Sequence, residues 1–229
     1  MDPAPLERAA QLAQSFLDGL PERPVGSSAR FEDLLAALAR PIPDTGLDPT
    51  AVVEELARLA EPGLVASAGP RYFGFVIGGS LPAALAADWL TSAWDQNAAL
   101  CAASPAAAAV EQVTAGWVLD LLGLPAGAGV GFVTGCQMAN FSALAAARRA
   151  VLARAGWNVE ENGLQGAPPV RVIVGEEAHA TILSALRLLG LGSGGAYRGE
   201  TDGQGRMRAE RLQEALESGQ GPTIVCAQA

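Results

Sequence analysis

Apolar residues recur at helical spacing in three short stretches near the start of the chain. The first predicts a helix over residues 4–20, and the second predicts one over residues 31–40. A third is predicted from Asp48 to about residue 60, with Asp48 as the N-cap and Pro49 at the first helical position. These pieces are amphipathic and too short to bury a core of their own. We therefore expect residues 1–60 to form a helical arm that packs on another surface, such as a partner subunit.

From residue 61 on, helical stretches come to alternate with short apolar runs typical of buried parallel strands. The predicted elements are helices at 82–93, 105–122 (with Ser104 as N-cap), about 136–155, 181–189 and 206–217, an extended segment at 97–103, a buried strand or turn at 130–133, a loop at 156–169, and strands at 170–174 and 223–227. This order predicts an α/β fold with a mostly parallel sheet flanked by helices. The sequence stops just after the last strand, so either the sheet is small or residues 61–229 are the first part of a larger domain.

Composition narrows the range of functions. The net charge of -9 argues against a nucleic-acid surface, and no apolar run reaches the ~18–20 residues of a membrane span. The N-terminus lacks the layout of a signal peptide. Cys101, Cys136 and Cys226 are far apart in sequence, which suits free thiols in a reducing compartment. We therefore expect a cytoplasmic protein that binds neither nucleic acid nor membranes.

The basic residues are unusual. All 15 are arginine, and lysine is absent from the sequence. No side chain of this sequence can therefore form a Schiff base with a carbonyl group. Histidine occurs once, at residue 179.

A candidate phosphate site lies where the helix after residue 135 begins. Backbone N–H groups at a helix start lack intrahelical partners, and the helix dipole favours an anion there. The sequence TGCQMAN at residues 134–140 would thus present Gly135, Cys136 and Gln137 to a phosphate group. The alternative is an ordinary connection between a strand and a helix.

His179 is the second candidate, because it follows the carboxyl end of a predicted buried strand. An imidazole there could stack on a flat cofactor ring or transfer a proton near neutral pH. The alternative is a surface or helix-capping residue. The sequence has none of the HExxH, Walker lysine, GxSxG or paired CxxC motifs, and we predict no metal site.

Five motifs in order resemble those of the group II pyridoxal-phosphate-dependent decarboxylases, which include the aromatic-amino-acid and glutamate decarboxylases. They are PRYF at 70–73, SP at 104–105 with Glu111, TGCQMAN at 134–140 with Ala147-Arg148, EAH at 177–179, and GRMR at 205–208. The resemblance covers about residues 65–229 and implies a homodimer with the aspartate-aminotransferase-like fold (fold type I). It implies release of carbon dioxide from an L-amino acid through an external aldimine.

The resemblance also implies roles for single residues. Cys136 and Gln137 would bind the phosphate of pyridoxal 5'-phosphate, and His179 would stack on its pyridine ring. Gln228 falls where the family usually has a threonine that touches the cofactor, and Phe75 falls in the substrate-pocket segment. The family's pyridine-binding aspartate and Schiff-base lysine would follow residue 229. We therefore expect this chain to be the N-terminal half of such an enzyme and to be inactive alone.

Two other interpretations stay open at this point. One is another fold-type-I enzyme with the same cofactor, such as an aminotransferase-like enzyme or a different lyase. The other is a non-catalytic α/β module that binds a phosphorylated ligand at residues 134–140.

Overall fold

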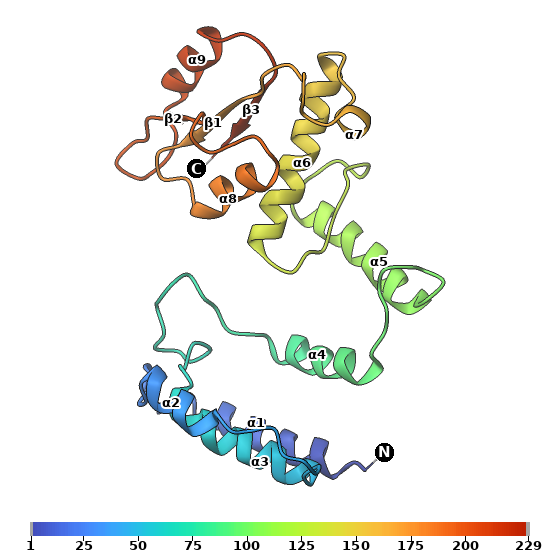
Figure 1. Cartoon of the computed structure of the whole chain (residues 1–229), viewed down its shortest axis with the longest axis vertical. Coiled ribbons are helices and arrows are strands. Elements are labelled where there is room, and N and C mark those ends of the chain that lie inside the picture. Colours follow the sequence, from blue (N-terminus) through green and yellow to red (C-terminus); the bar gives the residue numbers. More distant parts are fainter. Residues whose placement is uncertain (1, 228–229) are drawn as a thin grey trace. The chain divides into compact units, whose positions relative to one another are not determined.

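The computed structural model describes residues 2–227, and its contacts divide the chain into two compact units (Figure 1). One unit extends to Asn97, and the other begins at Ala98. The predicted boundary between a helical arm (residues 1–60) and a larger domain (from residue 61) stays a prediction. Among the described residues, none of the helices combines the length and apolar character needed to cross a bilayer.

The first unit consists of helices and loops. Its elements are α1 (Ala4–Gly19), α2 (Phe31–Leu38), α3 (Pro49–Ala60), the 3₁₀ helix η1 (Glu61–Gly63) and α4 (Pro82–Trp94). The predicted start of α3 is confirmed, since the Asp48 side chain accepts a hydrogen bond of 2.8 Å from the Ala51 N–H. Helix α1 packs against α3, and an ion pair of 2.7 Å joins Arg8 to Glu54. None of α1, α2, α3 and α4 contains a buried residue.

The second unit carries the sheet. Its elements are α5 (Pro105–Leu121), α6 (Cys136–Arg154), α7 (Val159–Asn162), β1 (Arg171–Gly175), α8 (Ala180–Leu188), β2 (Tyr197–Gly199), α9 (Ala209–Glu217) and β3 (Thr223–Cys226). The strand order is β2-β1-β3, and β1 pairs in parallel with both neighbours. The predicted alternation of helices and parallel strands is therefore confirmed in the described part of the chain. Four of the five residues of β1 are buried, as expected for a central strand.

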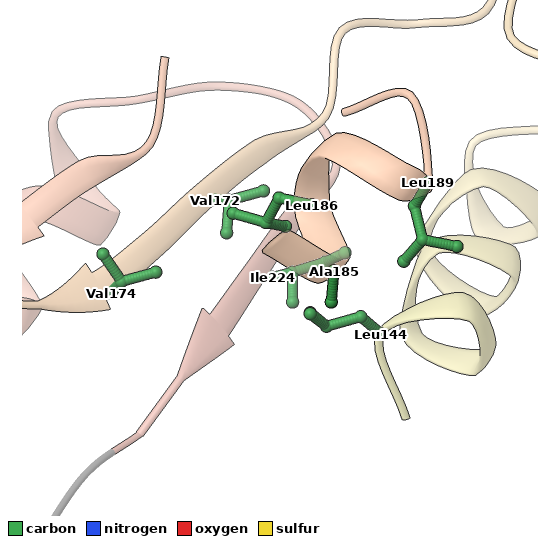
Figure 2. Packing of buried hydrophobic residues seen from close by; sticks show 7 residues of the cluster. All are labelled: Leu144, Val172, Val174, Ala185, Leu186, Leu189 and Ile224. Atoms are coloured by element: carbon green, nitrogen blue, oxygen red, sulfur yellow. The ribbon is translucent and has the colours of Figure 1, made fainter. Parts of the chain in front are cut away.

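One apolar cluster holds α6 and α8 against the sheet. Figure 2 shows its buried members, which are Leu144, Val172, Val174, Ala185, Leu186, Leu189 and Ile224. Val172 and Val174 are two residues apart on β1, so they point to the same face of the sheet. Ala185 and Leu186 of α8 are fully buried there. The cluster thus fixes the position of each helix relative to the carboxyl ends of β1 and β3.

One segment predicted to be extended is not, and another, predicted as a buried strand or turn, is irregular and partly exposed. Residues 97–103 form turns, in which the N–H groups of Ala103 and Ser104 both donate to Leu100 O at 2.9 and 3.1 Å. The run lacks β-branched residues, and the turn leads directly into the Ser104 cap of α5. Residues 130–133 are irregular, and Phe132 and Val133 are 52% and 41% exposed. No strand of the described chain pairs with them, so local apolar character does not make them a strand.

Two elements were not predicted, and a third begins later than predicted. The predicted loop at 156–169 contains α7, and the strand β2 was not predicted. Helix α9 begins at Ala209 and not at Arg206, because Thr201 and Met207 form an antiparallel bridge. Arg206 is held in that hairpin by its ion pair of 2.7 Å with Asp202. The Arg206 guanidinium and backbone N–H donors lower the pKa of the Asp202 carboxyl.

Candidate functional site: the starts of two helices at the carboxyl edge of the sheet

The start of α6 presents backbone donors without a side-chain cap. Gly135 occupies the N-cap position, and the first turn contains no acidic residue. The N–H groups of Met138 and Ala139 both donate to Gly135 O at 3.0 Å. The N–H groups of Cys136 and Gln137 precede these bonds and have no partner inside the helix. A Cβ placed on Gly135 would have no heavy atom within 4 Å, so space remains open in front of these donors.

His179 is the N-cap residue of α8 and lies four residues beyond the end of β1. The Ala178 N–H donates to Gly175 O at 3.0 Å, which turns the chain away from the sheet. At the N-cap position, the imidazole Nδ1 of His179 accepts a hydrogen bond of 3.2 Å from the Thr181 N–H. The residue is exposed, so its ring can contact a ligand while one nitrogen is bound to the helix start.

Two side chains of α6 connect these helix starts. Gln137 Nε2 donates to Thr181 O at 3.3 Å, and Asn140 Nδ2 donates to Thr181 Oγ1 at 2.8 Å. At the other end of α8, Arg148 Nη1 donates to Leu189 O at 2.7 Å. The start of α6 and His179 are therefore held side by side, and their roles in cofactor binding stay predictions.

The carboxyl ends of β1 and β3 lie at the same edge of the sheet, because Val174 pairs with Cys226 in parallel register. Ligands of open α/β sheets gather at such an edge. Burial raises the pKa of the Cys226 thiol, which keeps this group neutral near pH 7. Gln228, a predicted cofactor contact, lies outside the described residues. Within residues 2–227, no cluster of His, Cys, Asp and Glu side chains is arranged to hold a metal ion.

Phe75 belongs to the first unit, whereas the two helix starts belong to the second. Its side chain is 91% exposed, and both Phe75 and Val76 have φ of 55°, in the left-handed region. A β-branched residue such as Val76 rarely adopts that conformation. The structure describes the two units separately, so the role of Phe75 in substrate binding stays a prediction.

Comparison with known proteins identifies the family. The model of the pyridoxal-dependent decarboxylase conserved domain matches residues 32–229. The chain belongs to this family. This membership confirms the resemblance found in the sequence. The fold-type-I prediction is confirmed by likeness to solved structures, such as that of mouse CSAD, which is 24% identical with a TM-score of 0.81 over 98% of this chain and 48% of that one.

Three relatives illustrate the likeness. The aromatic-L-amino-acid decarboxylase of Bacillus atrophaeus is 27% identical over 97% of this chain and 45% of its own length. Tryptophan decarboxylase 1 of Oryza sativa subsp. japonica is 31% identical over 76% of this chain and 37% of its own length. The crystal structure of Oryza sativa TDC with PLP and tryptamine is 26% identical, with a TM-score of 0.80 over 93% of this chain and 47% of that one. The chain thus spans less than half the length of these family members.

The structure adds two residues to the predicted site. Thr181 and Asn140 connect His179 to α6, and sequence reasoning gave neither of them a role. Two signals were present: Asn140 is three residues from Gln137, on the same face of a helix, and Thr181 is two residues after His179. The hydrogen bond between Asn140 and Thr181 depends on packing between segments about forty residues apart in the sequence.

Proposed function

We propose that the protein containing this sequence is a pyridoxal-phosphate-dependent decarboxylase that releases carbon dioxide from an L-amino acid. The observation that carries the proposal is the placement of the α6 start beside His179, through Thr181. It joins a set of anion-binding donors to an exposed flat ring at the carboxyl edge of a parallel sheet. Membership of the decarboxylase family supports the same reaction.

The phosphate group would bind at the start of α6. The N–H groups of Cys136 and Gln137 can donate to its oxygens, and the positive end of the helix dipole favours its charge. The space beside Gly135 is open, since a Cβ there would meet no heavy atom within 4 Å apart from its chain neighbours. No lysine or acidic residue lies in the first turn of α6, so backbone groups of this helix would provide the binding.

His179 would lie over the pyridine ring and exchange a proton with the reacting substrate. Its Nδ1 is held by Thr181, which leaves Nε2 and the faces of the ring for these tasks. When bound, pyridoxal phosphate supplies an electron-poor ring that accepts the electron pair left by the departing carbon dioxide. The protein's part is to orient the ring and to provide the proton donor.

The remaining parts of the proposed enzyme involve residues beyond those described. Covalent attachment of pyridoxal phosphate requires a lysine amine, which this sequence lacks. We place that lysine, and an aspartate that pairs with the pyridine nitrogen, in the rest of the full-length protein. The proposal includes a cofactor contact from Gln228, a cytoplasmic homodimer, and inactivity of residues 1–229 alone.

The proposed substrates are aromatic or acidic L-amino acids. Relatives of this chain carry the names aromatic-L-amino-acid decarboxylase and acidic amino acid decarboxylase. Phe75 would contribute an apolar contact, and its exposure leaves the side chain available. The ring face of Phe75 suits an aromatic substrate better than a carboxylate.

The experiment is to add pyridoxal phosphate to the full-length protein and supply a panel of aromatic and acidic L-amino acids. We expect a visible absorbance band from the bound cofactor, release of carbon dioxide, and an equal amount of amine. An aldehyde or keto acid in place of the amine would instead indicate another reaction of the same cofactor. A full-length sequence without lysine, or a protein that binds a phosphorylated ligand but not pyridoxal phosphate, would contradict the proposal.

Pyridoxal phosphate is expected to protect Cys136 of the full-length protein against alkylation by iodoacetamide. Cys136 is exposed at the start of α6, where the phosphate would cover it. Cys101 is also exposed and serves as an internal control whose modification should not change. Peptide mass spectrometry measures both sites in one sample, and we expect at least about a fivefold slower reaction of Cys136 at saturating cofactor. Equal rates at Cys136 with and without cofactor would place the phosphate elsewhere.

A further inference from the structure

Thr181 uses each of its polar groups to connect the proposed phosphate site to His179. Its carbonyl accepts from Gln137 Nε2 at 3.3 Å, and its hydroxyl accepts from Asn140 Nδ2 at 2.8 Å. Its backbone N–H and its hydroxyl both lie within hydrogen-bond distance of His179 Nδ1, at 3.2 and 2.9 Å. Gln137 and Asn140 are three residues apart on α6, so one face of that helix makes both contacts.

The donors and acceptors in this chain of bonds have one consistent direction. A backbone N–H can only donate, so His179 Nδ1 must carry a lone pair toward Thr181. The Thr181 hydroxyl accepts from Asn140, and its own hydrogen is then available for the same nitrogen. A neutral imidazole with Nδ1 as acceptor carries its proton on Nε2.

We propose that Asn140 and Thr181 are positioning residues, which hold His179 in the Nε2–H tautomer and fix the plane of its ring against the cofactor. The inference rests on the proposed function, in which His179 stacks on pyridoxal phosphate. A neutral imidazole suits an electron-poor pyridine ring, whereas a second cation stacked on it would be repelled. The same tautomer directs the Nε2 proton away from α8, where it can be donated.

A helix cap alone does not require this arrangement. The bond from the Thr181 N–H to His179 Nδ1 by itself satisfies the cap of α8, and it uses only the backbone of Thr181. The Asn140 amide and the Thr181 hydroxyl add a relay from another helix, with both side chains partly buried. Substitutions of the Asn140 and Thr181 side chains leave the bond from the Thr181 N–H to His179 Nδ1 in place. They therefore test the positioning of His179 without removing the cap of α8.

The test compares Thr181→Val and Thr181→Ser in the full-length protein. Thr181→Val keeps the shape and the backbone donor but removes the hydroxyl, whereas Thr181→Ser keeps the hydroxyl. We expect Thr181→Val to raise the dissociation constant of pyridoxal phosphate about fivefold, the effect of one hydrogen bond, and to change the visible circular dichroism of the bound cofactor. Thr181→Ser should restore both to within about twofold. Ser142→Ala, at an exposed position on α6, is the matched control.

A second variant tests the direction of the relay. In Asn140→Asp, the new carboxylate can only accept, so it would draw the Thr181 hydroxyl hydrogen away from His179. The Thr181 N–H still donates to Nδ1 in this variant, so the proton stays on Nε2. We expect the nitrogen-15 signal of Nδ1 to shift relative to the unsubstituted protein, because Nδ1 loses the hydrogen bond from the Thr181 hydroxyl. The signals are assigned by their loss in His179→Gln. Unchanged nitrogen-15 signals in Asn140→Asp, or an unchanged dichroism spectrum in Thr181→Val, would overturn the inference.

The His179→Ala variant distinguishes the two possible failures. If it leaves cofactor affinity and dichroism unchanged, His179 does not contact the cofactor and the proposed role of His179 itself fails. If it alters both while Thr181→Val and Asn140→Asp alter neither, His179 contacts the cofactor without help from the relay. In that case only the positioning role is wrong.

Discussion

A Gly135→Asp substitution in the full-length protein is expected to weaken pyridoxal phosphate binding at least about a hundredfold. An aspartate at the N-cap position accepts hydrogen bonds from the N–H groups of the first turn of a helix. These include donors that the phosphate would use at the start of α6, and the carboxylate would also repel the phosphate charge. Each charge-assisted bond contributes about 1.5–3 kcal/mol, so the loss of two accounts for the expected effect. Titration of the cofactor absorbance measures it.

Gly135→Asn is the matched control, because asparagine has the same shape and also caps helices but carries no charge. We expect a smaller loss of affinity with Asn than with Asp. The free energy of unfolding of the cofactor-free protein should not fall with either substitution, since both are favourable N-caps and a Cβ at Gly135 meets no neighbouring atom. Normal affinity in Gly135→Asp would show that the phosphate does not bind at α6.

A His179→Ala substitution is expected to lower kcat of the full-length enzyme about a hundredfold or more, the usual range for loss of a general acid or base. It should also weaken cofactor binding, because stacking of two aromatic rings contributes about 0.5–1.5 kcal/mol. That range corresponds to a rise of about twofold to thirteenfold in the dissociation constant. Steady-state kinetics at saturating cofactor and a separate cofactor titration give the two numbers independently.

His179→Phe separates the two roles of the imidazole. Phenylalanine keeps a flat ring for stacking but has no exchangeable proton, so we expect cofactor affinity near that of the unsubstituted protein and a kcat as low as that of His179→Ala. The position tolerates a larger side chain because His179 is exposed. Unchanged kcat in both variants would rule out a catalytic role for His179.

Helix starts were the part of the fold most readily predicted. Asp48 with Pro49, and Ser104 with Pro105, mark the starts of α3 and α5, and in the structure each cap side chain accepts from the backbone three residues on. Capping depends on residues that are neighbours in sequence, so no tertiary information is needed. The buried strand β1 was predictable for a related reason, since a continuous apolar run between breaks suits the centre of a parallel sheet.

One strand that depends on a distant partner was not predicted. β2 has only three residues and gains its strand conformation by pairing with the edge of β1. The apolar residues 130–133 find no strand partner in the described chain and stay irregular. Pairing of this kind is decided by which edges the rest of the fold leaves open, and local propensity carries little information about it.

The sequence by itself determined the family, the alternation of helices with parallel strands, the candidate anion-binding start of α6 and the candidacy of His179. Each depends on motifs or on residues close together in the chain, where propensity, capping and periodicity act. Only the tertiary structure decided that α6 and α8 begin side by side and that Thr181 and Asn140 join them. The packing of Leu144, Leu186 and Ile224 sets that proximity, because it fixes both helices on one face of the sheet.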